Sequence, residues 1–191
     1  MTSFNIYLTG VGGQGIGLLS ETILRAADHA GLKVKGVDTH GLAQRGGIVV
    51  SSIRIGDSVY SPMIPAGSAD LVVGLERHEA LRGCNAYLKD GGSLIFYDTI
   101  WQPLSVRMND APETAADDLN VAAGKRNIRI IRVFNDHLKD PRMQNIAVLS
   151  QMDKNFLVPG ISTEHYKAAM QDLMQGHMLK KNMALFDEMR K

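Results

Sequence analysis

An apolar segment near the start of the chain runs directly into a turn crowded with glycine, and a helical pattern follows it. The stretch from residue 4 reads FNIYLTGVGGQGIGLL. Glycine tolerates positive φ and leaves no Cβ in the way, so another backbone or a phosphate can approach such a turn closely. Beyond the turn, apolar residues recur at helical spacing from Ile16 to Ala30, and Gly31 ends the pattern. A strand, a glycine turn and a helix in this order predict an α/β fold.

The rest of the chain alternates short apolar runs with helical patterns. A strand at 33–37 would close a βαβ-like start, and further strands are predicted at 48–55, 71–74, 93–97 and 128–134, with a short hairpin partner at 58–61. Helices are predicted around 77–81, 113–124 and 144–152, and a long C-terminal helix from about Ser162. This alternation predicts a single domain over residues 1–191. Its fold would be three-layer α/β/α and Rossmann-like, with a mostly parallel sheet and helices on both faces.

Charge and cysteine content exclude several functions. The 191 residues carry a formal net charge of +1 without a long basic block, so we expect neither nucleic-acid nor membrane binding. Cys84 is the only cysteine, so the chain forms no internal disulfide and lacks the thiolates that an iron–sulfur cluster needs. We expect Cys84 to be a packed side chain. No basic leader or apolar run of spanning length occurs, and we expect a soluble cytoplasmic protein.

The glycine turn admits two interpretations. Gly10, Gly12 and Gly15 match the dinucleotide pattern G-x-G-x-x-G, and a helix N-terminus after such a turn favours an anion. The turn would equally serve only to pack the helix against the sheet. A dinucleotide site also requires an acidic residue after the second strand, where Asp38 stands, whereas Gly13 and Gln14 are atypical of dinucleotide binders. A ligand cradle, a nicotinamide site and a structural turn therefore all stay open.

A second polar loop, DTHGLAQRGG over residues 38–47, has the composition of an anion contact. The residues of this loop that we consider as candidate contacts are Gln44, Arg45, Gly46 and Gly47. The guanidinium offers a fork of donors and the glycines expose backbone amides. Because open α/β sheets bind ligands at the carboxyl ends of their strands, we expect both loops and Glu76 to share that edge. An exposed β-turn, and a helix N-terminal carboxylate at Glu76, are the alternatives.

Complete catalytic machinery is absent from the sequence. There is no G-x-S-x-G, Walker A or H-E-x-x-H motif, and Arg82 stands where a zinc motif beginning at His78 would need its second histidine. We therefore expect neither a catalytic residue nor a metal site. Methionines at helical spacing in the last helix suit either a core stripe or docking against another subunit; they are Met170, Met174, Met178 and Met183.

Five segments occur in an order that resembles one known family. They are GVGGQGIGLLSE, HGLAQRGG, SSIRIG, ADLVVGLERHEALR and YLKDGG. The chain resembles the gamma subunit or gamma domain of 2-oxoacid:ferredoxin oxidoreductases, and within that family the small beta subunit of indolepyruvate ferredoxin oxidoreductase. The likeness is strong over residues 4–97 and looser beyond them.

The resemblance implies a reaction shared between subunits. A 2-oxoacid, here indolepyruvate or another aryl-pyruvate, is oxidatively decarboxylated on thiamine diphosphate, electrons leave through iron–sulfur clusters to ferredoxin, and coenzyme A takes the acyl group. Thiamine diphosphate, magnesium and [4Fe-4S] clusters would lie on a large catalytic partner in a hetero-oligomer, with ferredoxin met indirectly. This chain would be an accessory subunit that is inactive alone and holds no covalently bound cofactor.

Carried over to this sequence, the family's ligand and interface contacts fall on the two glycine loops and, more weakly, on Glu76. The first loop contributes Gly10, Gly12, Gly13, Gln14 and Gly15, and the second contributes Gln44, Arg45, Gly46 and Gly47. Arg45 would pair with a phosphate of coenzyme A or with a partner carboxylate. The alternatives are a stand-alone NAD(P)-dependent dehydrogenase and a non-enzymatic nucleotide-binding module.

Overall fold

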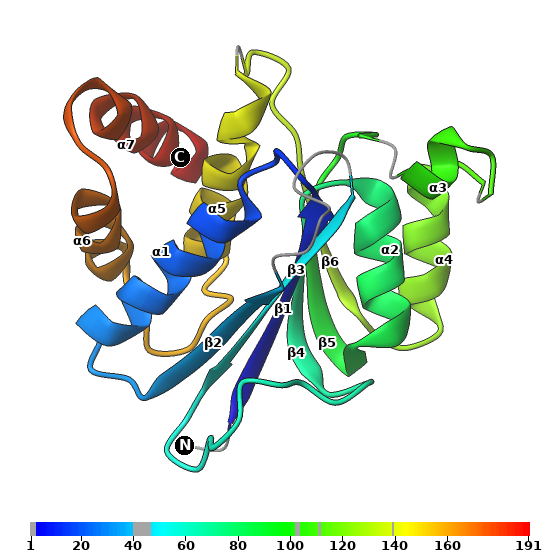
Figure 1. Ribbon diagram of the computed structural model, residues 1–191, viewed down its shortest axis with the longest axis horizontal. Coiled ribbons are helices and arrows are strands. Elements are labelled where there is room, and N and C mark those ends of the chain that lie inside the picture. Colours follow the sequence, from blue (N-terminus) through cyan, green and yellow to red (C-terminus); the bar gives the residue numbers. More distant parts are fainter. Residues whose placement is uncertain (1–2, 40–46, 102–103, 111, 139) are drawn as a thin grey trace.

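The computed structural model describes residues 3–39, 47–101, 104–110, 112–138 and 140–191. Within them, one six-stranded sheet has the order β2-β3-β1-β4-β5-β6 (Figure 1). The strands are β1 (Phe4–Val11), β2 (Val34–Thr39), β3 (Ile48–Ile55), β4 (Ala69–Gly74), β5 (Leu88–Tyr97) and β6 (Arg129–Val133). Strands β1, β4, β5 and β6 pair in parallel, and β3 alone runs against its neighbours.

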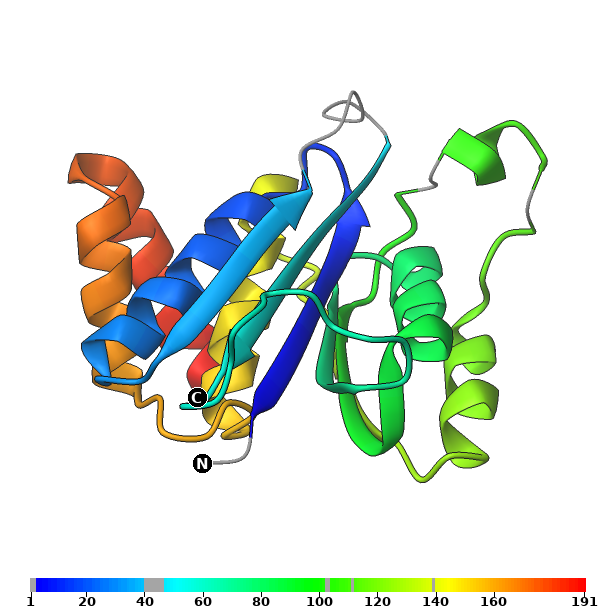
Figure 2. The ribbon, with the colours of Figure 1, turned by 60° about the horizontal axis from the view of Figure 1, so that its bottom comes forward.

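Helices cover both faces of this sheet (Figures 1 and 2). One face carries α1 (Ile16–His29) and α5 (Gln144–Lys154), onto which α6 (Thr163–Leu173) and α7 (Gly176–Arg190) pack from outside. The other face carries α2 (Arg77–Ala86) and α4 (Ala116–Gly124). A short helix, α3 (Leu104–Arg107), stands on an arm beyond the sheet, and a 3₁₀ turn, η1 (Pro141–Met143), leads into α5. The predicted three-layer, Rossmann-like α/β/α fold with a mostly parallel sheet is confirmed.

Alternation along the central strands builds two apolar cores. Ile6 and Leu8 of β1 point toward α1 and α5, whereas Tyr7 points toward α2, where it stacks on Tyr87 with ring centroids 3.9 Å apart. Cys84 is fully buried on the α2 side, and burial raises the pKa of its thiol, as expected of a packed side chain.

The predicted βαβ start is wrong in one respect, because β2 does not lie beside β1. The intervening strand β3 pairs antiparallel with both of them. Its inward side chains Ile53 and Ile55 are 0% and 1% exposed beneath α1, so β3 buries more apolar surface inside the sheet than it would at the edge. The strand expected at 58–61 is also absent: Arg54 instead donates to the carbonyls of Ser61 and Met63, at 3.1 and 3.3 Å.

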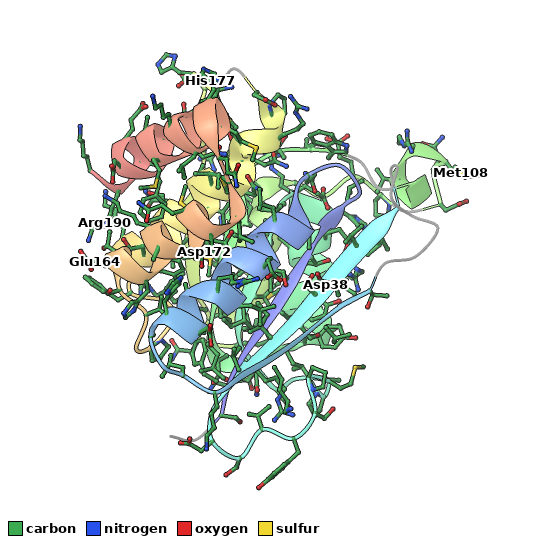
Figure 3. The ribbon with its side chains drawn as sticks, turned by 60° about the vertical axis from the view of Figure 1, so that its left-hand side comes forward. Asp38, Met108, Glu164, Asp172, His177 and Arg190 are labelled. Atoms are coloured by element: carbon green, nitrogen blue, oxygen red, sulfur yellow. The ribbon has the colours of Figure 1, made fainter. Side chains whose placement is uncertain are left out.

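The long C-terminal helix expected from about residue 162 is two helices, α6 and α7. Met174 and Gln175 are extended between them, and Gly176 has a φ of 57°. Met174 is buried, and its sulfur accepts a hydrogen bond of 3.1 Å from the Asn182 side-chain amide. The break lets α7 return across α5, and Figure 3 places His177 and Arg190 at opposite ends of it. No helix in the described ranges has the length and apolar character needed to cross a bilayer.

Candidate functional site

The glycine turn is locked by the side chain of Gln14, which is fully buried. Its Oε1 accepts a hydrogen bond of 2.7 Å from the Val11 amide, and its Nε2 donates to the Leu75 carbonyl at 2.9 Å. Gly10 makes room for this arrangement, because a Cβ there would lie 2.8 Å from Gln14 Oε1 and 3.2 Å from Leu75 Cβ. Gln14 and Gly10 thus shape the turn from beneath, tying the ends of β1 and β4 together.

The two glycine loops meet directly. The amide of Gly12 donates a hydrogen bond of 2.9 Å to the carbonyl of Gly47, which joins the turn after β1 to the segment that enters β3. Gly13 is exposed and has a φ of 103°, and no atom of the described residues lies within 4 Å of where its Cβ would point. The remaining residues predicted in the second loop, Gln44, Arg45 and Gly46, lie outside the described residues.

Gly15 connects the turn to α5. Its φ is 82°, and a Cβ would lie 2.6 Å from Asn145 Nδ2, which donates to the Gly15 carbonyl at 3.2 Å. Gly15 is also the N-cap of α1, with no side-chain hydrogen bond to the first turn and no acidic residue in it. Among the described residues, no side chain accepts from the first amides of α1, and such a helix end favours an anion.

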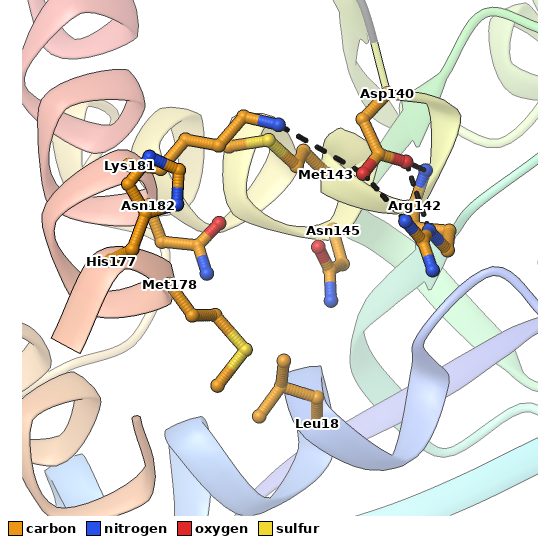
Figure 4. A pocket seen from close by; sticks show the side chains of 9 residues that line it. All are labelled: Leu18, Asp140, Arg142, Met143, Asn145, His177, Met178, Lys181 and Asn182. Atoms are coloured by element: carbon orange, nitrogen blue, oxygen red, sulfur yellow. Dashed lines mark hydrogen bonds and ion pairs between the residues drawn. The ribbon is translucent and has the colours of Figure 1, made fainter. Parts of the chain in front are cut away.

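A cavity of about 350 Å³ opens beside this turn (Figure 4). It lies where the first turns of α1, α5 and α7 converge, lined by Leu18, by Arg142 and by His177, Met178 and Lys181. Within the described part of the chain, the starts of α1 and α7 have neither a side-chain cap nor an acidic first turn, whereas α5 continues from η1, which the Asp140 carboxylate caps. Cationic side chains and helix N-termini thus face an apolar floor, which suits a ligand with both an anionic and an apolar part.

Asp140 partly neutralises the cations of this cavity. Its carboxylate accepts hydrogen bonds of 3.0 Å from Arg142 and lies 3.9 Å from Lys181 Nζ (Figure 4). The hydrogen bonds from Arg142 hold the pKa of Asp140 below its usual value. Arg142 and Lys181 thus share one carboxylate, so the three side chains together keep a net positive charge that can attract an anion.

Glu76 follows β4 and caps α2. Its Oε2 accepts a hydrogen bond of 3.0 Å from the His78 amide, and its Oε1 accepts another from the Glu79 amide. The residue is 1% exposed, and burial raises its pKa to about 7 although the amide donors oppose that shift. Glu76 lies at the carboxyl edge of the sheet, as predicted. Its carboxylate accepts hydrogen bonds from the amides of the first turn of α2 and acts as the cap of that helix.

A buried carboxylate that sequence analysis did not single out lies at the same edge. Asp98, directly after β5, is 4% exposed and accepts hydrogen bonds from both Arg77 and Arg132. Burial disfavours its ionisation, but the two guanidinium groups outweigh it and hold the pKa of Asp98 below its usual value. This pair of salt bridges ties the start of α2 to the end of β6.

Asp38, the acidic residue that a dinucleotide site would need, is held elsewhere. Asp38 lies on β2 and accepts a hydrogen bond of 2.9 Å from the Ser20 hydroxyl of α1. Because β3 lies between β2 and β1, Asp38 is not on the strand next to the glycine turn.

The cavity residues Arg142, Asn145 and Lys181 were not predicted. Arg142 and Asn145 precede and begin a helix at the correct sheet edge, but the return of α7 that brings Lys181 to them depends on an unpredicted break.

Fold and site together define an α/β protein of Rossmann-like architecture, with glycine loops and a cationic cavity at the carboxyl edge of its parallel strands. The chain belongs to the pyruvate ferredoxin/flavodoxin oxidoreductase family, whose model matches residues 5–191. This confirms the resemblance to the gamma subunits of 2-oxoacid:ferredoxin oxidoreductases that the ordered motifs indicated.

Curated relatives are named indolepyruvate oxidoreductase subunit IorB. The protein from Archaeoglobus fulgidus is 34% identical over 183 residues, which cover 94% of this chain and 90% of the relative. The protein from Thermococcus kodakarensis is 40% identical over 119 residues, which cover 62% of this chain and only 58% of the relative's length.

Solved structures share the fold. The gamma subunit of a keto/oxoacid ferredoxin oxidoreductase from Geobacter sulfurreducens aligns with a TM-score of 0.66 at 20% identity, covering 98% of this chain and 96% of that one. A 2-oxoglutarate:ferredoxin oxidoreductase from Magnetococcus marinus, solved with 2-oxoglutarate, coenzyme A and succinyl-CoA bound, aligns with a TM-score of 0.71 at 18% identity. The alignment covers 100% of this chain and 31% of that protein.

Proposed function

We propose that this chain is the accessory subunit of a 2-oxoacid:ferredoxin oxidoreductase that acts on indolepyruvate or another aryl-pyruvate and contributes to the binding of coenzyme A. The family membership supports the reaction class, and the relatives named indolepyruvate oxidoreductase subunit support the substrate. The observation that carries the proposal is the hydrogen bond between Gly12 and Gly47, which brings both glycine loops of the family motif to one sheet edge.

Coenzyme A matches the chemistry of this edge. Its phosphates are anionic, and the edge offers the uncapped start of α1, the exposed Gly13 and the cations Arg142 and Lys181. Its adenine and pantetheine parts need less polar contacts, which Leu18 and Met178 provide within the cavity (Figure 4). In this proposal the chain's own residues bind and orient the coenzyme, and Arg45 adds a further phosphate contact.

The redox cofactors belong, in this proposal, to a large catalytic partner. The chain has one cysteine, which is buried, and an iron–sulfur cluster needs several thiolates. Among the described residues, no group of three or more His, Cys, Asp or Glu side chains is placed to hold a metal ion. Thiamine diphosphate, magnesium and [4Fe-4S] clusters would therefore sit on the partner, and ferredoxin would be reduced by the hetero-oligomer.

A stand-alone NAD(P)-dependent dehydrogenase is less well supported. A Rossmann dinucleotide site places its acidic residue on the strand beside the glycine-bearing strand. Here β3 occupies that position, and Asp38 on β2 is engaged by Ser20 of α1. A non-enzymatic nucleotide-binding module would share the same sheet edge but would need no catalytic partner.

Reconstitution tests the proposal. The chain and the large thiamine-dependent subunit from the same organism are produced separately, and ferredoxin reduction by indolepyruvate and coenzyme A is measured for each alone and for the mixture. We expect activity only from the mixture, with phenylpyruvate and 4-hydroxyphenylpyruvate compared as substrates. Full activity of either chain alone, or an active mixture that ignores coenzyme A, would contradict the proposal. Micromolar NAD or NADP binding by the lone chain would favour the dehydrogenase.

A further inference from the structure

In the part of the chain that the structure describes, one face of strands β2 and β3 has no covering helix (Figure 2). On their other face α1 packs closely, and a Cβ on Gly36 would lie 2.8 Å from Leu24 Cδ1 of that helix. On the open side, α2 packs against β1, β4 and β5. The two outer strands are thus covered on one side only, whereas the neighbouring strands are covered on both.

Strand alternation fixes which side chains face this open side. Val34 and Val49 join the core beneath α1, so the residues next to them in each strand, and every second residue from there, point to the open side. Val50 confirms the direction, because it packs against the core on the α2 side. The open face therefore carries seven side chains from the two strands, and these are Lys35, Val37, Thr39, Ile48, Val50, Ser52 and Arg54.

Apolar side chains on this face are exposed. Val37 and Ile48 are 37% and 45% exposed, and Tyr60 and Met63 of the following loop are 87% and 65% exposed. Arg54 holds that loop on the same side through its hydrogen bonds to the Ser61 and Met63 carbonyls. Exposed apolar side chains beside a sheet face that no helix of the described residues covers are a feature of an interaction surface.

The charged side chains that β2 and β3 send to this side are both cations. Lys35 and Arg54 come from β2 and β3, which send no carboxylate to this side. Arg82 of α2 donates to Tyr7 and Thr9 of β1 at 3.4 and 3.0 Å, but it is paired with the buried Glu79 carboxylate at 2.6 Å and adds no net charge. A second copy of the chain would bring these cations against cations, whereas a partner surface with apolar residues and carboxylates would complement them.

We propose that this open face of β2 and β3, with the loop that carries Tyr60 and Met63, is the docking surface for the large catalytic subunit. The inference rests on the proposed function and adds the location and chemistry of the contact. It assigns the partner an apolar surface bordered by Asp or Glu side chains. It also places the contact on a sheet that ends in the glycine loops, so docking and coenzyme A binding share one rigid element.

Binding of the purified large subunit to single variants tests the inference. Val37→Glu puts a carboxylate on the open face opposite Ser52, and we expect the Kd to rise at least about tenfold, as for a central interface residue. The matched control is Val121→Glu on α4, where Val121 is 62% exposed on the opposite flank of the molecule, and we expect its Kd to stay at the wild-type value. Tyr60→Ala provides a second probe that removes only exposed surface, with an expected rise of about threefold or more.

The outcomes separate this inference from the proposed function. Wild-type Kd values for both Val37→Glu and Tyr60→Ala, with unchanged thermal unfolding, would overturn the docking surface and leave the proposed function standing. Failure of the wild-type chain to bind the large subunit at all would contradict the proposed function. If sedimentation shows a homodimer that Val37→Glu converts to monomer, the occupant is a second copy and the inference is wrong.

Discussion

The amide of Gly12 donates to the carbonyl of Gly47 across 2.9 Å, and this single contact joins the two glycine loops of the chain. It exists because β3 runs antiparallel beside β1, so the start of β3 lies next to the end of β1. A regular βαβ arrangement would place the end of β2 there instead. The reversed strand thus brings the second glycine loop to the first.

Gly10→Ala should destabilise the fold. The new Cβ would meet Gln14 Oε1 at 2.8 Å and Leu75 Cβ at 3.2 Å, so the side chain that locks the turn must move. Overpacking of this kind costs about 1–3 kcal/mol, measured as a lower free energy of unfolding in urea. The control is Gly17→Ala in α1, where a Cβ meets no atom of the described residues within 4 Å, and we expect no loss. Equal effects of the two substitutions would show that Gly10 is not sterically constrained.

Glu76 should make stability fall as the pH rises through the neutral range. Burial raises its folded pKa to about 7 from 4.5, so the folded state binds the proton more tightly than the unfolded state does. The corresponding stabilisation is complete below about pH 4.5 and is lost as the pH passes 7; by linkage it amounts to about 3 kcal/mol at most. Relative to Glu76→Gln, the wild-type unfolding free energy should therefore decline from pH 5 to pH 8. A constant difference between the two proteins would refute this.

Removing a cation of the cavity should weaken coenzyme A binding. Arg142→Ala and Lys181→Ala each remove one positive charge, and we expect the Kd in the assembled complex to rise about three- to tenfold. Lys180→Ala is the matched control, since Lys180 is exposed on the same helix and does not line the cavity. Calorimetry at two salt concentrations provides the measurement. An equal effect from Lys180→Ala would reduce the result to a loss of net charge.

Arg45→Ala should also weaken coenzyme A binding. A guanidinium that meets a phosphate contributes about 1.5–3 kcal/mol, so the Michaelis constant for coenzyme A should rise at least tenfold. The rise should be much smaller for Arg45→Lys, which retains the charge but loses the planar fork. An unchanged Michaelis constant in both variants would remove this role from Arg45.

The fold could be predicted largely from sequence because its signals are local. The apolar runs, the helical spacing after the turn and the positions of glycine identify β1, α1 and the alternation that follows. The order of the strands could not be predicted in the same way. Nothing local to β3 states that Ile53 and Ile55 bury more surface between β1 and β2 than beside either alone.

In the candidate site, too, the features that follow from local sequence could be predicted, and those that depend on tertiary packing could not. The glycine turn and the position of Glu76 follow from their places after β1 and β4. The cavity combines Leu18, Arg142 and Lys181, which are distant in sequence. It depends on the interruption of the C-terminal helix at Met174 and Gln175, where the backbone is extended. Helical spacing of the methionines continues across that break, so periodicity alone could not reveal it.

The most direct test of the account is the amide spectrum of the isotopically labelled chain, assembled with its large subunit, before and after coenzyme A is added. We predict that the amide signals of Gly12, Gly13 and Gly15 and the side-chain amide signal of Asn145 shift, and that pantetheine, which lacks the phosphates, leaves them in place. Shifts confined to other parts of the chain, or the same shifts with pantetheine, would contradict a phosphate site at the joined glycine loops.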